Sequence, residues 1–340
     1  MAKKKISIKD IAKTLGISIT TVSFILNGKA REKRISEELT KKVQQYIKEV
    51  GYTPSHLAQS LRLGKSKVIV FMVEDISNQF FASIARLIEE KAYKNGYKII
   101  YCSTENETAK ARELINTFKV RNVDGFIITP TPDLEESVKG LLDEGFGLVL
   151  FDRYMPSVDS SYVIVENEKS AFEATQHLID TGCKNVALIT VESEQIQMTD
   201  RLKGYQNAML QNQLTPNIFQ VKFHNIAEEE AYNRIFDYFS NNPDFDGVFF
   251  ATNYLAFEGL EALGNLGMDV PGQVKVVSFD DHYFFKLYKP KITAIEQPLE
   301  LIAEKLMEAI LHQLDEAEMN SEPKQFTLPN KLNARDSSII

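Results

Sequence analysis

The sequence predicts an α/β protein in two parts, a small helical head followed by a larger body of alternating strands and helices. Charge is divided unevenly, because residues 1–67 carry a net +10 whereas residues 68–340 carry a net −18. Apolar residues recur at helical spacing through roughly the first 50 residues. From Val68 onward, short continuous apolar runs alternate with helical patterns, which is typical of parallel sheets covered on both faces. A basic head on an acidic body indicates an appended nucleic-acid-binding module.

Composition excludes several classes of protein. An apolar fraction of 44% excludes wholesale disorder. Cys102 and Cys183 are the two cysteines, which excludes a disulfide scaffold and fits a reducing compartment. The apolar runs are strand-sized, shorter than the roughly 18 residues of a membrane span, and no apolar signal segment follows the basic N-terminus. We therefore expect a soluble cytoplasmic protein with no membrane partner.

The head begins with two short helices joined by a tight turn. Ser7 and Asp10 resemble a capping box at the start of the first helix, and Ser18 can cap the second. Gly16 tolerates the left-handed turn between them, and the small Ala12 lets the helices approach closely. The apolar positions are Ile8, Ile11, Ala12, Leu15, Val22, Ile25 and Leu26.

Two helices with a four-residue turn have the geometry of a helix-turn-helix, whose second helix enters the major groove of DNA. The alternative is an unrelated helical hairpin, because Ala-x3-Gly alone occurs in many chains. Agreement at five packing positions and the positive charge of the segment favour DNA binding.

A third helix is predicted from Ser36, its cap, to Gly51, which ends it. Its inner face carries Leu39, Val43, Tyr46, Ile47 and Val50. The preceding loop, residues 29–34, holds four cations in six residues. This loop is either a solvated connection or a set of phosphate contacts, and its place beside the second helix favours phosphate contacts.

A hinge is predicted at residues 54–66. Pro54 suits a first helical turn, but the stretch is a weak helix alone, and a linker follows it from Gly64. One interpretation is a helix that folds only when two copies meet on DNA, with Leu61 wedged into a minor-groove step. The other is an ordinary linker leucine, and the residues do not separate the two.

Residues 7–62 resemble the DNA-binding head of the lactose/galactose-repressor (LacI/GalR) family of bacterial transcriptional regulators. The spacing of the matching residues is highly specific. The match comprises Ile8-Lys9-Asp10-Ile11-Ala12, Gly16-Ile17-Ser18, Thr21-Val22-Ser23, Asn27, Gly51-Tyr52, Pro54, Ala58 and Leu61.

The resemblance implies that the second helix reads base edges while neighbouring polar groups hold the DNA backbone and the hinge enters the minor groove. Phe24 stands where the family commonly has Arg, so one bidentate contact to guanine is missing. The basic loop after Asn27 is also longer than in the lactose repressor, so the operator sequence stays open. Base edges are assigned to Ile19, Thr20 and Phe24, the DNA backbone to Ser18, Thr21, Ser23 and Asn27, the minor groove to Leu61 and Arg62, and further DNA contacts to Ser7, Arg31, Lys33, Arg34, Ser55 and His56.

The body contains the same order of elements twice. Val123-Asp124-Gly125 and Phe245-Asp246-Gly247 each lead into an equivalent buried strand. Two similar α/β lobes predict a ligand cleft at the carboxyl ends of the strands. The expected strands are 68–73, 98–102, 125–129, 148–151, 186–190, 219–223, 247–252, 274–279 and 324–335, and the expected helices are 80–95, 109–120, 199–211, 227–239 and 299–314.

This part resembles the periplasmic-binding-protein-like body of the same family. The domains expected are a head at 1–53, a hinge helix and linker at 54–66, and an effector-binding and dimerisation body at 67–340. Within the body we expect an N-lobe of residues 67–165 and 297–325 and a C-lobe of residues 166–296 and 326–340.

Polar residues at the predicted strand ends are candidates for an effector site. Carboxylates or an amide paired with arginine can hold vicinal hydroxyls, and an aromatic ring can stack on an apolar ligand face. The alternative is that Asp152, Asp280 and Asp281 cap loops and Phe80 belongs to the core. The candidates are Phe80, Phe81, Asp152, Arg153, Arg201 at the start of its helix, Asn253 and Asp280, of which the resemblance implies Asp152, Arg201, Asn253 and Asp280.

The family often has an aromatic platform in the loop after Phe223, where this chain has Ile226, which argues against a simple sugar. No nucleotide-binding, hydrolase or metal-binding motif occurs, so we expect no enzyme activity, cofactor or metal. A solute-binding protein would need a signal peptide and no basic head, and an enzyme with a regulatory head would need a catalytic set.

The sequence therefore predicts a repressor that grips a pseudo-palindromic double-stranded operator as a homodimer, under control of a carbohydrate or related metabolite. A dimer is expected because no apolar heptad tail follows the last predicted strand. The alternative is a transcriptional activator, or a corepressor-dependent regulator with a non-sugar effector.

Overall fold

The computed structural model describes residues 6–52, 65–222, 228–315 and 322–339. It divides into two compact units, residues 1–66 and residues 67–340, and the division falls at the predicted start of the body. Several predicted residues, namely Ser55, His56, Leu61, Arg62 and Ile226, lie outside the described residues. Within the described ranges, no helix is both long and apolar enough to cross a membrane.

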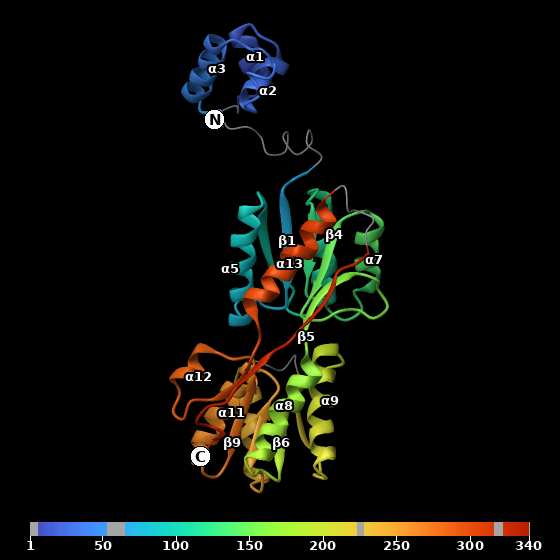
Figure 1. Cartoon of the computed structure of the whole chain (residues 1–340), viewed down its shortest axis with the longest axis vertical. Coiled ribbons are helices and arrows are strands. Elements are labelled where there is room, and N and C mark those ends of the chain that lie inside the picture. Colours follow the sequence, from blue (N-terminus) through green and yellow to red (C-terminus); the bar gives the residue numbers. More distant parts are fainter. Residues whose placement is uncertain (1–5, 53–64, 223–227, 316–321, 340) are drawn as a thin grey trace. The chain divides into compact units, whose positions relative to one another are not determined.

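Within residues 6–52 the first unit folds into the helices α1 (Ile8–Leu15), α2 (Ile19–Leu26) and α3 (Glu37–Val50), as Figure 1 shows. Ile11, Val22 and Val43, one from each helix, are fully buried against one another in a single small core. Ala12 and Ile25 complete this core. The helix-turn-helix packing predicted from the sequence is confirmed.

The ends of these helices are set by local chemistry. Ser7 and Asp10 form a reciprocal capping box, in which the Ser7 hydroxyl accepts from the Asp10 amide and the Asp10 carboxylate accepts from the Ser7 amide. Ser18 accepts from the Thr21 amide at 3.0 Å and so caps α2. Gly16 has a φ of 66° after α1, in the left-handed region that glycine adopts without strain. The predicted caps are therefore confirmed.

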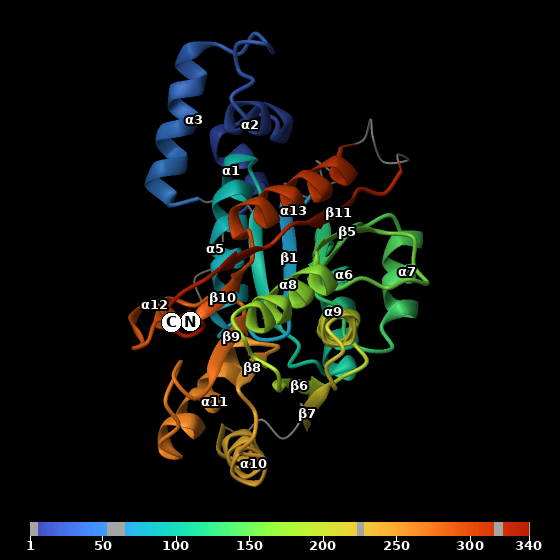
Figure 2. The same ribbon diagram turned by 60° about the horizontal axis from the view of Figure 1, so that its bottom comes forward.

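One lobe of the second unit is built on an all-parallel sheet in the order β11-β5-β4-β3-β1-β2. Helices α5 and α13 pack on one face of this sheet, and α6 and α7 pack on the other (Figures 1 and 2). The elements are β1 (Val68–Val73), α5 (Gln79–Lys94), β2 (Lys98–Ser103), α6 (Thr108–Val120), β3 (Gly125–Ile128), α7 (Glu135–Asp143), β4 (Gly147–Phe151), β5 (Ser161–Val165), α13 (Leu299–Leu314) and β11 (Gln325–Leu328).

The other lobe repeats this arrangement in the order β12-β10-β9-β8-β6-β7, parallel except for β12. The strands of this lobe and the helices packed against them share one continuous hydrophobic core. The elements are α8 (Asn167–Asp180), β6 (Val186–Glu192), α9 (Ile196–Gln211), β7 (Asn217–Lys222), α10 (Glu228–Asn241), β8 (Gly247–Phe250), α11 (Asn253–Asn265), β9 (Lys275–Phe279), α12 (Tyr283–Leu287), β10 (Thr293–Glu296) and β12 (Lys331–Asn333).

The repeated Asp-Gly pair has the same structural use in both lobes. Before β3, the Asp124 carboxylate accepts a hydrogen bond from the Lys67 amide. Before β8, the Asp246 carboxylate accepts from the amides of Lys184 and Asn185. Each aspartate thus ties the start of its strand to the chain entering the neighbouring strand, and the predicted similarity of the two lobes is confirmed.

Two sequence-based boundaries are wrong. The predicted strand 324–335 is two strands, because Pro329 lacks an amide donor and follows β11, which pairs with β5, while β12 pairs with β10. The last crossing between lobes therefore falls after Leu328 and not after residue 325. Helix α9 begins at Ile196, earlier than expected, because Gln197 and Met198 are buried in its first turn. Arg201 consequently lies in the second turn of α9 and not at its start.

Candidate functional sites

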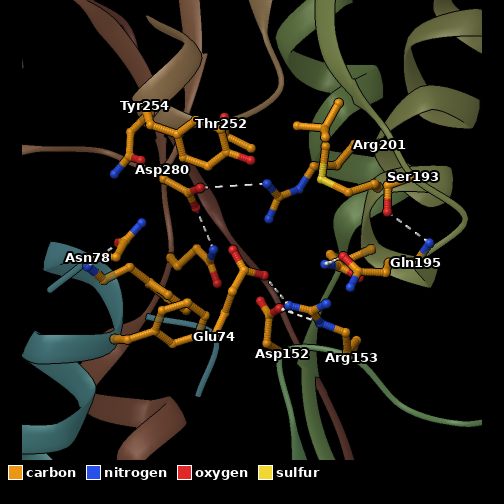
Figure 3. Close-up of a pocket in the computed structure, with 17 residues that line it drawn as sticks. Glu74, Asn78, Asp152, Arg153, Ser193, Gln195, Arg201, Thr252, Tyr254 and Asp280 are labelled. Carbon is orange, nitrogen blue, oxygen red and sulfur yellow. Dashed lines mark hydrogen bonds and ion pairs between the residues drawn. The ribbon is translucent and has the colours of Figure 1, made fainter. Parts of the chain in front are cut away.

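Two aspartates occupy equivalent positions at the carboxyl ends of strands in the two lobes. Asp152 follows β4 and Asp280 follows β9, the third strand from the matching edge of each sheet. Both have a φ of 68°, a left-handed conformation that aspartate tolerates better than most residues. The turn after each strand directs its carboxylate into the cleft between the lobes (Figure 3).

In the lobe that contains β9, Arg201 is buried and is held through its Nε and Nη1 atoms. Its Nε donates to Asn167 Oδ1 at 2.9 Å, and its Nη1 donates to the Ala251 carbonyl at 2.8 Å. The guanidinium carbon lies 3.6 Å from the centroid of the Phe279 ring, and Nη1 lies 3.6 Å from Asp280 Oδ2. Four neighbours therefore fix the plane of this guanidinium before any ligand arrives.

Asp280 is shared between this arginine and the crossing segment before α13. Gln297 donates from Nε2 to Asp280 Oδ1 at 2.6 Å. Burial raises the pKa of Asp280, and the nearby Arg201 charge and the Gln297 hydrogen bond oppose that rise. A buried carboxylate with remaining acceptor capacity is suited to receive ligand hydroxyls.

The other lobe presents a second carboxylate–arginine cluster. Arg153 is 3% exposed and donates from Nη2 to Glu74 Oε2 at 2.8 Å and from Nε to Asp152 Oδ2 at 3.3 Å (Figure 3). Burial raises the pKa of Glu74, and the charge and hydrogen bond of Arg153 oppose that rise. Glu74 was missed in the sequence, although its place directly after β1 was a usable signal.

A hydrogen-bonded bridge joins the two lobes across the cleft. Asn106 Oδ1 accepts from Arg153 Nη1 at 3.2 Å and from Gln195 Nε2 at 2.8 Å. Asn106 follows β2 in one lobe, and Gln195 immediately precedes α9 in the other. Separation of the lobes at this point must therefore break the bridge.

The structure brings all seven predicted effector residues to one pocket between the lobes, which encloses about 60 Å³. Phe80 is half-buried with its ring 5.7 Å from that of Phe151, whereas Phe81 is 6% exposed and belongs mainly to the core. The effector roles themselves stay predictions. Further lining residues that sequence reasoning missed are Glu74, Asn78, Val191, Ser193, Gln195, Gln197, Met198, Thr252, Tyr254 and Gln297.

The two raised carboxyl pKa values predict a pH dependence of stability. Glu74 and Asp280 bind protons more tightly in the folded protein than in the unfolded chain. Their protonation therefore stabilises the folded state fully below the ordinary pKa values of 4.5 and 3.8, and this stabilisation is lost as pH rises through the raised pKa values. We expect the variant Glu74→Gln/Asp280→Asn to gain stability relative to the unmodified protein as pH rises between about 4 and 8. Urea unfolding at several pH values measures this difference, and a difference independent of pH would contradict the prediction.

The head exposes the first turn of α2. Ile19 is 44% exposed, and Ser18 and Thr20 beside it are also exposed. An exposed isoleucine at the start of a recognition helix is a candidate for contact with thymine methyl groups. Among the other predicted DNA contacts, Ser7, Asn27, Arg31, Lys33 and Arg34 are exposed, and Thr21, Ser23 and Phe24 are half-buried. Their DNA-binding roles remain predictions.

The basic loop before α3 is a hydrogen-bonded turn. The Ile35 amide donates to the Ala30 carbonyl at 2.9 Å. Lys33 pairs with Glu32 at 2.9 Å, and its ammonium lies 5.6 Å from the centroid of the Phe24 ring. Lys33 also lowers the pKa of Glu32. Part of the predicted positive charge is thus balanced locally, and the turn places a cation beside α2.

A helix-turn-helix unit joined to a two-lobed α/β unit with a buried polar cleft defines a DNA-binding transcriptional regulator. Residues 7–55 match the family model of bacterial regulatory proteins of the lacI family, and residues 175–338 match the periplasmic binding protein-like domain. The HTH-type transcriptional regulator RegA of Clostridium saccharobutylicum is 32% identical over 340 residues, which cover 98% of this chain and 99% of that protein. The chain belongs to the LacI family.

Other comparisons agree on the architecture. The ribose operon repressor of Halalkalibacterium halodurans is 28% identical over 98% of this chain and 97% of its own length. The solved structure of the lac repressor dimer bound to operator and an anti-inducer has a TM-score of 0.84 at 19% identity and covers 99% of this chain and 100% of that chain. At this identity the likeness supports the fold alone.

Proposed function

We propose that this protein is a repressor that binds a pseudo-palindromic operator as a homodimer and responds to a carbohydrate or related polyhydroxylated metabolite in the cleft. The observation that carries the proposal is the convergence of two buried carboxylate–arginine clusters, Asp280 with Arg201 and Asp152 with Arg153, on one pocket. Such pairs offer both acceptors and donors to vicinal hydroxyls. The ribose operon repressor among the relatives supports this effector class. As a regulator that binds operator DNA, the protein is proposed to act in the cytoplasm.

The proposed control works through the relative position of the two lobes. The chain crosses between them after β5, after β10 and after β11, so these three crossing segments connect the lobes. Gln297 belongs to the second crossing and donates directly to Asp280. A ligand that competes for Asp280 changes a contact in this crossing segment, and it shifts the equilibrium only by its differential affinity for the two arrangements of the lobes.

Two measurements test the proposal together. Selection from random double-stranded DNA with the full-length protein is expected to return a pseudo-palindromic site, whose affinity falls steeply with salt. A panel of sugars, sugar acids and nucleobases is then tested by thermal shift. At least one sugar is expected to raise the melting temperature of the body and to change the affinity of the protein for the operator. Enrichment of no sequence, or a response only to nucleobases, would contradict the repressor or the carbohydrate part respectively.

A second candidate role, activation or corepression, uses the same contacts with the opposite sign of coupling. Reporter expression with and without the effector separates the two. A repressor released by its effector raises expression when the effector is added, whereas a corepressor-dependent regulator lowers it.

The exposed apolar side chains of helix α12 favour the proposed dimer and lead to a specific prediction. Tyr283, Phe284 and Leu287 are 70%, 46% and 60% exposed, an unusual density of large apolar side chains on a five-residue helix. We expect Leu287→Glu to shift the protein to monomers and to weaken operator binding at least tenfold, because one head then grips one half-site. Sedimentation velocity measures the first effect, and fluorescence anisotropy with operator DNA measures the second.

A matched control is Leu210→Glu on α9, where the leucine is 63% exposed. We expect this variant to stay dimeric with unchanged operator affinity. An unchanged dimer in Leu287→Glu would remove α12 from the interface.

A further inference from the structure

The cleft continues beyond the effector pocket into a second, larger chamber. This outer chamber has a volume of about 870 Å³, whereas the inner pocket encloses about 60 Å³. Ligand-binding pockets for small molecules commonly measure about 300–1,000 Å³. The outer chamber is therefore large enough by itself to hold a small molecule. It is formed by the segments that follow β3, β4 and β6 together with the first turns of α9, and therefore by the carboxyl ends of strands from both lobes.

The two chambers share a wall. Arg153, Ser193 and Gln195 line both of them. Arg153 and Gln195 are the residues that the bridge through Asn106 connects. The inner and outer chambers are thus consecutive parts of one cleft, separated by three polar side chains that a ligand can replace as hydrogen-bond partners.

Each chamber is lined by a residue with a buried polar atom that finds no hydrogen-bond partner in the described parts of the chain. This atom is Oε1 of Gln197, which lines the inner pocket, and Oγ1 of Thr131, which lines the outer chamber. Both side chains are more than nine-tenths buried, at 6% and 2% exposure. Leaving a buried polar group unpaired is costly, and a ligand with hydroxyls in both chambers would satisfy the two atoms together.

The charge and surface of the chambers indicate the chemistry of that ligand. Among the described residues, three carboxylates and two arginines line the inner pocket, and four carboxylates and three cations line the outer chamber. This slight acidic excess disfavours a phosphorylated or carboxylated ligand. Tyr154, Met155 and Pro132 give the outer chamber apolar surface beside its polar groups, which suits the two faces of a sugar ring.

We infer that the effector is a neutral glycoside of at least two sugar units. One unit displaces the bridge through Asn106 and so widens the inner pocket among Asp152, Asp280 and Arg201, and the next unit lies in the outer chamber against Tyr154 and Thr131. This inference rests on the proposed function, since it specifies the ligand of the same cleft. The outer chamber is then the part of the site that selects for length.

Calorimetric titration of the full-length protein tests the inference with matched pairs of probes. The pairs are glucose with cellobiose and maltose, xylose with xylobiose, and galactose with lactose. At least one disaccharide is expected to bind ten times or more tightly than its component monosaccharide. Thr131→Val, which removes only the unpartnered hydroxyl, is expected to weaken that disaccharide about threefold to tenfold and to leave monosaccharide binding unchanged.

Thr129→Val is the matched control, because Thr129 also has a buried hydroxyl without a partner in the described structure and does not line either chamber. It is expected to change neither affinity. Since both substitutions are nearly isosteric and remove an unsatisfied group, both variants should fold, and equal melting temperatures verify this.

The outcomes separate the inference from the proposed function. Monosaccharides that bind as tightly as every disaccharide overturn the inference and leave the carbohydrate effector standing. Equal disaccharide affinity in Thr131→Val and Thr129→Val also overturns it, because the outer chamber is then not used. Absence of binding by every sugar, while other metabolites stabilise the protein, overturns the carbohydrate effector itself.

Discussion

Asp280→Asn is expected to weaken effector binding about 100-fold or more while the protein keeps its fold. The substitution removes the charge that we propose receives ligand hydroxyls, and two hydrogen bonds to a charged group are together worth about 3 kcal/mol or more. Stability should change little, because the introduced amide oxygen can still accept from Gln297, and Arg201 keeps Asn167 and the Ala251 carbonyl as acceptors. The raised pKa of Asp280 also predicts little loss of stability, because burial disfavours the charged form that the substitution removes. Calorimetric titration and thermal unfolding measure the two effects.

The neighbouring aspartate is a demanding control. The Asp281 side chain is also buried, but it forms a bidentate ion pair with the Arg335 guanidinium. It does not line the inner pocket. Asp281→Asn should therefore destabilise the body by several kcal/mol, in the range of about 3–5 for breaking a buried pair, and leave effector affinity unchanged. If Asp280→Asn retained full effector binding, Asp280 would have no place in the site.

Removal of residues 1–66 is expected to abolish specific operator binding, a loss of at least about a thousandfold, and to leave a folded body that still binds effector. The division of the chain into units at residues 66 and 67 supports independent folding of the body. The remaining surface has no helix-turn-helix in its described ranges, and residues 68–340 carry a net −18 that repels DNA. Anisotropy with operator DNA and a thermal shift with effector measure the two expectations.

A milder change in the head provides the comparison. Arg31→Ala, Lys33→Ala and Arg34→Ala combined should weaken specific and non-specific binding alike. The slope of log affinity against log salt should also fall by about one for each phosphate that the variant no longer neutralises. Specific binding by the truncated body would contradict the assignment of DNA binding to the head.

Much of the head was predictable because its structure is local. Ser7, Ser18 and Ser36 each cap a helix that begins at the next residue, and the apolar spacing identifies the face that meets Val43 in the core. Most strands of the body were predictable too, since continuous apolar runs such as those of β1, β3 and β4 are buried on both faces. Strands β5 and β10 were not predicted. Boundaries were harder where tertiary burial extends an element, as it does at the start of α9.

The basic head and acidic body predicted two parts with different functions, DNA binding in one and ligand binding in the other, and the chain does fold as two units divided at residues 66 and 67. Sequence position also identified Asp152, Arg153 and Asp280, because strand ends of such sheets meet in a cleft. Only the tertiary structure paired Arg153 with Glu74, 79 residues away, and Asn106 with Gln195, 89 residues away. These contacts, and the outer chamber behind them, depend on how two separately folded lobes come together. No local pattern of residues encodes that, because side chains from distant segments become neighbours only when both sheets have formed and packed.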